Sequence, residues 1–168
     1  MTQAPTVDRN TVMGAALIRL GSTVQEVVDV PAWMLRAREI PGALQALARA
    51  ETQLAAARLA LTREAVAQGV PADAGNSAAG WLRGLLNADP HSANEDARLA
   101  AVLDDPDSPT MAALATGAIR VGHARVITRA VQQLRAAKVD AGQVAKAEQL
   151  LLEQAATFDP PAAVAPGP

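Results

Sequence analysis

The sequence predicts an all-α protein, and two observations lead to this prediction. Apolar residues recur at helical spacing almost throughout the chain, for example at Met13, Leu17, Leu20, Val24 and Val27. No alternating run of apolar and polar residues is long enough to predict a strand. Forty of the 168 residues are alanine and aromatic residues make up 2%. We therefore expect a helical domain with a thin, aliphatic core.

The N-terminal part predicts a long helical hairpin. The first helix carries the apolar stripe above, with a candidate interruption at residues 21–23, and is expected to end at Pro31. A short segment around Trp33 follows, and Pro41-Gly42 predicts a second break. The longest helix is then expected over residues 43–68, because Gly69 suits the position after a helix C-terminus and a proline follows it.

Leucine recurs every seven residues in this longest helix, at Leu47, Leu54 and Leu61, with alanines beside it. Such a seam suits an antiparallel helix pair within the chain. The seam also allows self-association between two subunits. The first arrangement is favoured because both apolar seams lie close in sequence.

The C-terminal part predicts a compact cluster of short helices. Ser77 and Asp140 are expected to cap two of them, and Ser92 with Glu95 fits a capping box for another. Gly117 is expected to end a short helix before a longer one over residues 122–137, and a helical wheel of the longer helix places Val126 on its apolar side and Thr128 on its polar side. Asp89-Pro90 is expected to stop the helix that Ser77 caps, and Trp81 and Phe158 are expected in the core. The predicted divisions are a long-helix region 1–70, a helical cluster 71–159 and a disordered proline-rich tail 160–168.

Charge is segregated along the chain although the net charge is only −2. Residues 87–107 carry one basic and six acidic groups, whereas residues 108–139 carry five basic groups and no acidic one. The basic segment suits contact with phosphate groups. The alternative is that Arg125 and Arg129 bridge to the acidic segment folded beside them, as helices adjacent in sequence usually pack together.

The start of the helix over residues 122–137 is the main candidate site. Free N–H groups and the helix dipole favour an anion there, and basic side chains flank it. The alternative is a helix start braced by the acidic loop 104–107. The candidate DNA- or phosphate-contacting residues are Arg120, Gly122, His123, Arg125, Arg129 and Arg135.

Composition argues against most enzyme classes. The absence of cysteine excludes thiolate chemistry and cysteine-ligated zinc, and two histidines leave little for histidine-based catalysis. We expect no catalytic residue, cofactor or metal site, and expect Asp104, Asp105 and Asp107 to form a solvated turn. Three aromatic residues are too few for a stacking platform on single strands. The polar residues 1–10 and the lack of an 18-residue apolar run lead us to expect a cytoplasmic protein and no membrane contact.

Two segments carry a family resemblance. They are Ser-Ala-Ala-Gly-Trp-Leu at residues 77–82 and Leu-Ala-Thr-Gly-Ala-Ile-Arg-Val-Gly-His-Ala-Arg-Val-Ile at residues 114–127. Together they resemble the actinobacterial domain of unknown function 222, a helical domain found N-terminal to HNH endonuclease modules in mycobacterial repeat-family proteins. The long Leu/Ala/Arg helix and residues 155–160 extend this resemblance over roughly residues 40–160.

The resemblance implies a non-catalytic accessory domain of a mobile-element nuclease system that engages DNA or a protein partner. An HNH site needs a histidine to activate water and a metal to stabilise the leaving oxygen. His91 and His123 are 32 residues apart, with no Asn/His cluster nearby. We therefore expect the nuclease module to be missing from this chain. The alternatives are a structural or dimerisation module, or an inactive remnant of a nuclease.

The same region is also similar to the helix-turn-helix of ParB-type DNA-partitioning proteins. The helix that enters the major groove there corresponds to residues 92–103 here. That segment has Arg98 as its only cation, and Glu95 and Asp96 lie near its N-terminal end, where bases are read. The sequence therefore predicts a helix-turn-helix-like segment but does not favour sequence-specific reading of DNA by this helix.

Overall fold

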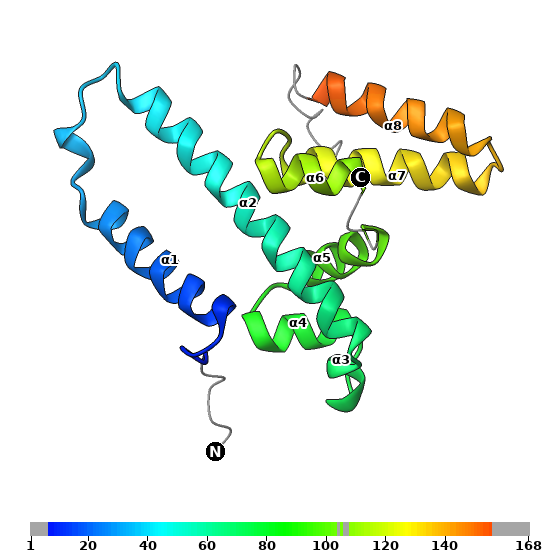
Figure 1. The fold of residues 1–168 in the computed structure, drawn as a ribbon, viewed down its shortest axis with the longest axis horizontal. Helices are drawn as coiled ribbons and strands as arrows, with labels where there is room; N and C mark the ends of the chain where they lie inside the picture. The colour runs from blue at the N-terminus through cyan, green and yellow to red at the C-terminus, as the bar shows by residue number, and fades with distance from the viewer. Residues whose placement is uncertain (1–6, 104, 106–107, 156–168) are drawn as a thin grey trace, which may run out of the picture. The chain divides into compact units, whose positions relative to one another are not determined.

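The computed structural model describes residues 7–103, 105 and 108–155, and these residues form helices joined by turns, without a strand (Figure 1). The predicted all-α fold is therefore confirmed. The chain divides into two compact units, residues 1–44 and 45–168. The predicted division into regions 1–70 and 71–159 stays a prediction, and the predicted tail 160–168 lies outside the described residues.

The first unit contains α1 (Val12–Asp29), the 3-10 helix η1 (Ala32–Met34) and the first residues of α2 (Ile40–Ala67). The Thr11 hydroxyl caps α1 by accepting a hydrogen bond from the Gly14 N–H at 2.9 Å. The helix continues through residues 21–23, so the candidate interruption there was wrong. It ends just before Pro31, as predicted.

The break expected at Pro41-Gly42 was also wrong, because α2 begins at Ile40 and both residues lie in its first turn. Proline fits there because the first N–H groups of a helix have no intrahelical acceptor. Both long helices of the predicted hairpin are thus present. The α2 helix ends at Ala67, one residue before the predicted end, and Gly69 follows with a left-handed φ of 77°.

The second unit contains the rest of α2 and the predicted cluster of shorter helices. These are α3 (Val70–Asp73), α4 (Ala78–Leu86), α5 (Pro90–Val102), α6 (Pro109–Thr116), α7 (Val121–Ala136) and α8 (Ala141–Ala155). Helix α4 packs on α5, and α6, α7 and α8 pack on one another. Helices α7 and α8 lie antiparallel and side by side (Figure 1). Helix α5 also contacts α7, which therefore has neighbours on two sides.

The core of the second unit is aliphatic, as the composition predicted. Its buried residues are Ala56, Leu59, Leu99, Ala100, Leu103, Met111, Leu114, Ile119, Ala124, Ile127, Val131 and Val144. Leu114 and Ala124 are completely inaccessible to solvent. Trp81 is half-buried and Trp33 is 82% exposed, so neither indole is a fully buried core residue. Phe158, also expected in the core, lies outside the described residues.

Three helix starts show which caps the sequence predicted. The Ser77 hydroxyl accepts from the Gly80 N–H, and the Asp140 carboxylate accepts from the N–H groups that open α8, as expected. The predicted cap at Ser92 was wrong, because α5 begins two residues earlier at Pro90. Asp89 is the N-cap, and its carboxylate accepts from the Ser92 N–H at 2.9 Å. The Asp89-Pro90 pair opens a helix here and does not merely end the preceding one.

Gly117 ends α6 as predicted, with a left-handed φ of 71°. The same turn is held by α2, because the Arg49 Nε–H donates to the Thr116 carbonyl oxygen at 2.9 Å. A Cβ on Gly117 would lie only 2.5 Å from the Arg49 Cγ atom. The turn therefore needs glycine for its backbone conformation and for the close approach of α2.

The two faces of α7 differ from the predicted wheel. Val126, expected inside, is 49% exposed, and Thr128, expected outside, is only 7% exposed. The reason is that α5 covers part of the polar face of α7, in addition to the contact with α6 and α8. The Thr128 hydroxyl is satisfied inside this contact by donating to the Ala124 carbonyl oxygen at 2.8 Å.

Candidate functional site

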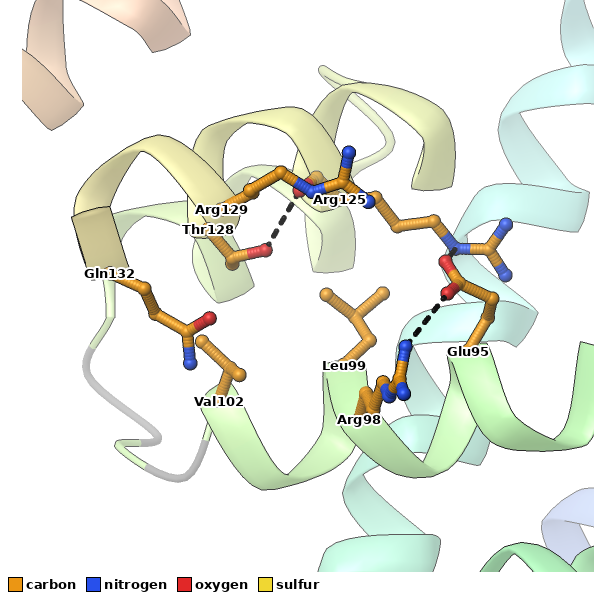
Figure 2. Close-up of a pocket in the computed structure, with 8 residues that line it drawn as sticks. All are labelled: Glu95, Arg98, Leu99, Val102, Arg125, Thr128, Arg129 and Gln132. Carbon is orange, nitrogen blue, oxygen red and sulfur yellow. Dashed lines mark hydrogen bonds and ion pairs between the residues drawn. The ribbon is translucent and has the colours of Figure 1, made fainter. Parts of the chain in front are cut away.

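A groove of about 300 Å³ runs between α5 and α7, and it brings basic residues from both helices together (Figure 2). Its lining residues are Glu95, Arg98, Leu99, Val102, Arg125, Thr128, Arg129 and Gln132. Three guanidinium groups and one carboxylate line it, so the lining carries a formal charge of +2. The groove therefore combines a basic rim with an apolar floor of leucine and valine.

Two acidic residues of α5 anchor the basic side chains around this groove. Asp96 accepts from Arg58 Nη2 of α2 at 2.9 Å and from Arg125 Nη2 of α7 at 3.3 Å. Glu95 lies 3.7 Å from Arg125 Nε and 3.8 Å from Arg98 Nη1. The two carboxylates are only 15% and 19% exposed. Asp96 thus links three helices through charge-assisted hydrogen bonds.

Arg125 is used inside the fold. Its side chain is 35% exposed, and both α5 carboxylates face its guanidinium group. The alternative in which the basic segment bridges to the acidic segment is therefore confirmed for this residue. The Arg125 charge is largely neutralised by these carboxylates, which leaves it less available to an external anion than the exposed arginines of the same segment.

Arg120, Arg129 and Arg135 have a different environment from Arg125. All three are exposed, and within the described parts of the chain none of them forms an ion pair. Arg129 lines the groove, and its side chain extends along the rim above Thr128 (Figure 2). The acidic partner expected for Arg129 is therefore absent from the described residues, and its charge faces solvent.

The start of α7 holds His123 inward. The His123 side chain is 8% exposed, and its Nδ1 atom accepts from the Arg120 N–H at 3.3 Å. Nδ1 therefore carries no proton in this hydrogen bond, and Nε2 is buried without a hydrogen-bond partner in the described structure. Gly122 is exposed beside it. Of the six candidate residues, His123 thus supports the helix start, whereas the others reach the surface at least in part.

Neither a metal-binding cluster nor a membrane-spanning helix occurs in the residues that the structure describes. No group of three His, Cys, Asp or Glu side chains that could hold a metal ion occurs in residues 7–103, 105 and 108–155. Asp104 and Asp107 of the predicted solvated turn lie outside that range. Within it, none of the helices is both long and apolar enough to cross a bilayer.

A second cleft, of about 500 Å³, lies between α2, α4 and α5 and was not predicted. Its lining residues are Arg63, Val66, Ala67, Ala78, Ala97, Ala100 and Ala101. Small side chains leave this space because alanine fills little of the gap between helices. The only signal in the sequence was the alanine content of three separate helices. It indicates that gaps will remain between helices, but it does not locate them.

The sequence did not indicate that Asp96 would form ion pairs with two arginines, or that Arg58 would be one of them. These residues are 38 positions apart, and no local spacing connects them. Comparison with known proteins adds no relative: no protein-family model, curated protein or solved structure matches this chain. The fold and the groove therefore define the protein only as an all-α domain with a basic interhelical groove.

Proposed function

We propose that the chain is a non-catalytic helical accessory domain that engages the DNA backbone through exposed arginines on and next to α7, of which Arg129 lies at the rim of the α5–α7 groove. The observation that supports this is the exposure of Arg120, Arg129 and Arg135, which have no ion pair in the described chain. They belong to a 32-residue segment without an acidic residue. Positive charge is thus held on the surface and left for an outside anion.

Binding of this kind is electrostatic and independent of sequence. Each phosphate that a cation neutralises releases condensed counterions, which gives a slope of about −0.9 in log affinity against log salt. Arg120, Arg129 and Arg135, with the 79%-exposed Arg98, supply at most four such contacts. We therefore expect weak binding that falls steeply with salt, and no strong preference for one DNA sequence.

The resemblance to the domain of unknown function 222 supports the same proposal. Domains of that kind precede HNH nuclease modules, so weak contact with DNA by an accessory domain would hold the nuclease near its substrate. His123 does not suit a general base, because it is buried and one of its ring nitrogens accepts a hydrogen bond from the backbone. The proposal therefore places no catalytic step in this chain.

Fluorescence anisotropy with a short labelled DNA duplex tests the proposal. The double variant Arg129→Glu/Arg135→Glu should bind at least tenfold more weakly at low salt and lower the salt slope by about one per removed contact. Arg83→Glu is the control, because Arg83 is also exposed but lies on α4, outside the basic segment 108–139. Equal losses in the double variant and the control, or no binding by the parent chain at low salt, would refute the proposal.

A structural or dimerisation module is the second candidate, and one observation favours it. Leu47, Leu54 and Leu61 are 45%, 40% and 46% exposed, although leucine is normally buried in a helical domain. A row of exposed leucines on one helix is typical of a protein contact surface.

A further inference from the structure

We propose that the α2 helix pairs with α2 of a second copy of this chain, as an antiparallel dimer centred on Leu54. This inference does not depend on DNA binding. The surface concerned is the α2 seam, defined as Leu47, Glu51, Leu54, Arg58 and Leu61. All five residues are exposed. They follow the alternating spacing of four and three residues that lets one helix face another.

The α2 seam points away from the core of its own unit. The buried residues of α2 are Thr52, Ala56, Leu59 and Thr62. At about 100° per residue, their mean direction lies roughly 145° from that of the leucines. A second helix can therefore approach the leucines without displacing the helices that pack on the opposite side.

The charges in the seam select both the partner and its direction. When two α2 helices run antiparallel with Leu54 facing Leu54 of the other copy, Leu47 faces Leu61, and Glu51 lies within one residue, roughly 1.5 Å along the axis, of Arg58. Every position is then matched with an apolar residue or with the opposite charge. In a parallel pair, Glu51 would face Glu51 and Arg58 would face Arg58, which is repulsive. Self-complementarity of one surface is what a two-fold symmetric dimer requires.

Arg58 can take part while keeping its internal contact. Its Nη2 atom donates to Asp96, but its side chain is 51% exposed, and a guanidinium group has five N–H donors. The remaining donors can reach a carboxylate of the second copy. Alanines at 50 and 57 flank the leucines and allow the two helices to approach closely.

The contact is short, which sets the expected strength. Leu47 to Leu61 spans 14 residues, or roughly 21 Å of helix. Three leucine layers of this length lie at or below the lower end of specific protein interfaces, which bury about 1,200 Å² in total. We therefore expect a dimer that forms on concentration and dissociates on dilution, with a dissociation constant on the order of micromolar.

Sedimentation equilibrium of the full chain and of two charge variants tests the pairing. Glu51→Arg places two arginines opposite each other, and Arg58→Glu places two glutamates opposite each other, so each variant alone should dimerise roughly tenfold more weakly or worse. Their equimolar mixture restores opposite charges at both positions and should dimerise like the parent chain. Glu64→Arg, an exposed residue of α2 outside the seam, is the control and should leave dimerisation unchanged.

Cysteine cross-linking gives a readout that does not depend on these charges. The chain has no cysteine of its own. Mixed Leu47→Cys and Leu61→Cys chains should form a disulfide under mild oxidation, whereas each variant alone should not. Cross-linking of each variant to itself would indicate a parallel pair and refute the proposal. A parent chain that stays monomeric up to high micromolar concentration, or a charge-variant mixture no stronger than its components, would also refute it.

Discussion

Asp96 is the residue whose replacement tests the ion-pair network most directly. It joins Arg58 of α2 and Arg125 of α7 to α5, and its side chain is only 15% exposed. Asp96→Asn keeps the size of the side chain and one acceptor oxygen but removes the charge. Both arginines then lose a carboxylate partner, and the Arg125 guanidinium is left with Glu95 alone at 3.7 Å.

The expected loss of stability follows from exposure and distance. The contact with Arg58 is short, 2.9 Å, but that arginine is 51% exposed, so solvent screening limits its contribution to about 0.5 kcal/mol. Arg125 is 35% exposed at 3.3 Å, and a charged hydrogen bond of this partly buried kind contributes about 1 kcal/mol. Asp96→Asn should therefore lower the free energy of unfolding by about 1–2 kcal/mol.

Urea unfolding followed by circular dichroism measures this change in the free energy of unfolding. We expect the variant and the parent chain to have the same m-value, because only stability should change. Asp73→Asn is the matched control, because Asp73 is exposed and lies on the short helix α3. The parent should also lose stability in high salt, whereas Asp96→Asn should lose less, since its ion pairs are already gone. If Asp96→Asn unfolds within 0.3 kcal/mol of the parent, a value inside the roughly 0.5 kcal/mol range of ordinary surface changes, the network does not stabilise the fold.

Three further outcomes are expected. Gly117→Ala should cost about 2 kcal/mol in urea unfolding, because a left-handed φ of 71° strains alanine and its Cβ meets Arg49. Thr110→Val should cost about 1–3 kcal/mol in the same assay, because the fully buried Thr110 hydroxyl donates to Glu148 Oε1 at 2.6 Å. Hydrogen bonds from Ser92 hold the pKa of Asp89 below its ordinary value of 3.8, so the stability from this cap should be present above that pH and lost as pH falls below it.

Each of these has its control. Gly69→Ala shares the left-handed conformation, with a φ of 77°, but its Cβ would meet nothing within 4 Å, so it should cost only about 1 kcal/mol. Equal losses of unfolding free energy in Gly69→Ala and Gly117→Ala would show that the close approach of Arg49 to Gly117 adds nothing to the cost. Thr110→Ser keeps the hydroxyl and should retain part of the stability that Thr110→Val loses. Asp89→Asn keeps a capping oxygen without titrating, so a parent and variant with the same acid-unfolding profile would contradict the assignment to Asp89.

Local signals in the sequence predicted much of the fold. Ser77 and Gly117 were assigned correctly because a hydroxyl cap and a left-handed glycine act within their own turn. The Asp89-Pro90 pair was misread, since the same two residues can end one helix or begin the next. Thr128 was placed outside because a helical wheel assumes one apolar face, whereas α7 has neighbours on two sides.

The candidate site was predicted only in part, for a related reason. Charge counting identified the basic segment, and the alternative of bridging to the acidic segment proved right for Arg125. The rotation of α7 about its axis relative to α5 decides which arginines form ion pairs within the chain. The spacing of residues along one helix does not determine this rotation. Arg129 lies four residues after Arg125, one turn further along, and it forms no ion pair with the described residues.

The order of contacts in the second unit has a consequence for how the chain folds. Helices α4 and α5, α6 and α7, and α7 and α8 are neighbours in sequence as well as in space, so their contacts close only short loops. The hydrogen bonds that attach α2 close longer loops, since Arg49 to Thr116 spans 67 residues, compared with 38 for Thr110 to Glu148 and 29 for Asp96 to Arg125. We expect the short helices to assemble within microseconds to milliseconds, and α2, although synthesised first, to join them last.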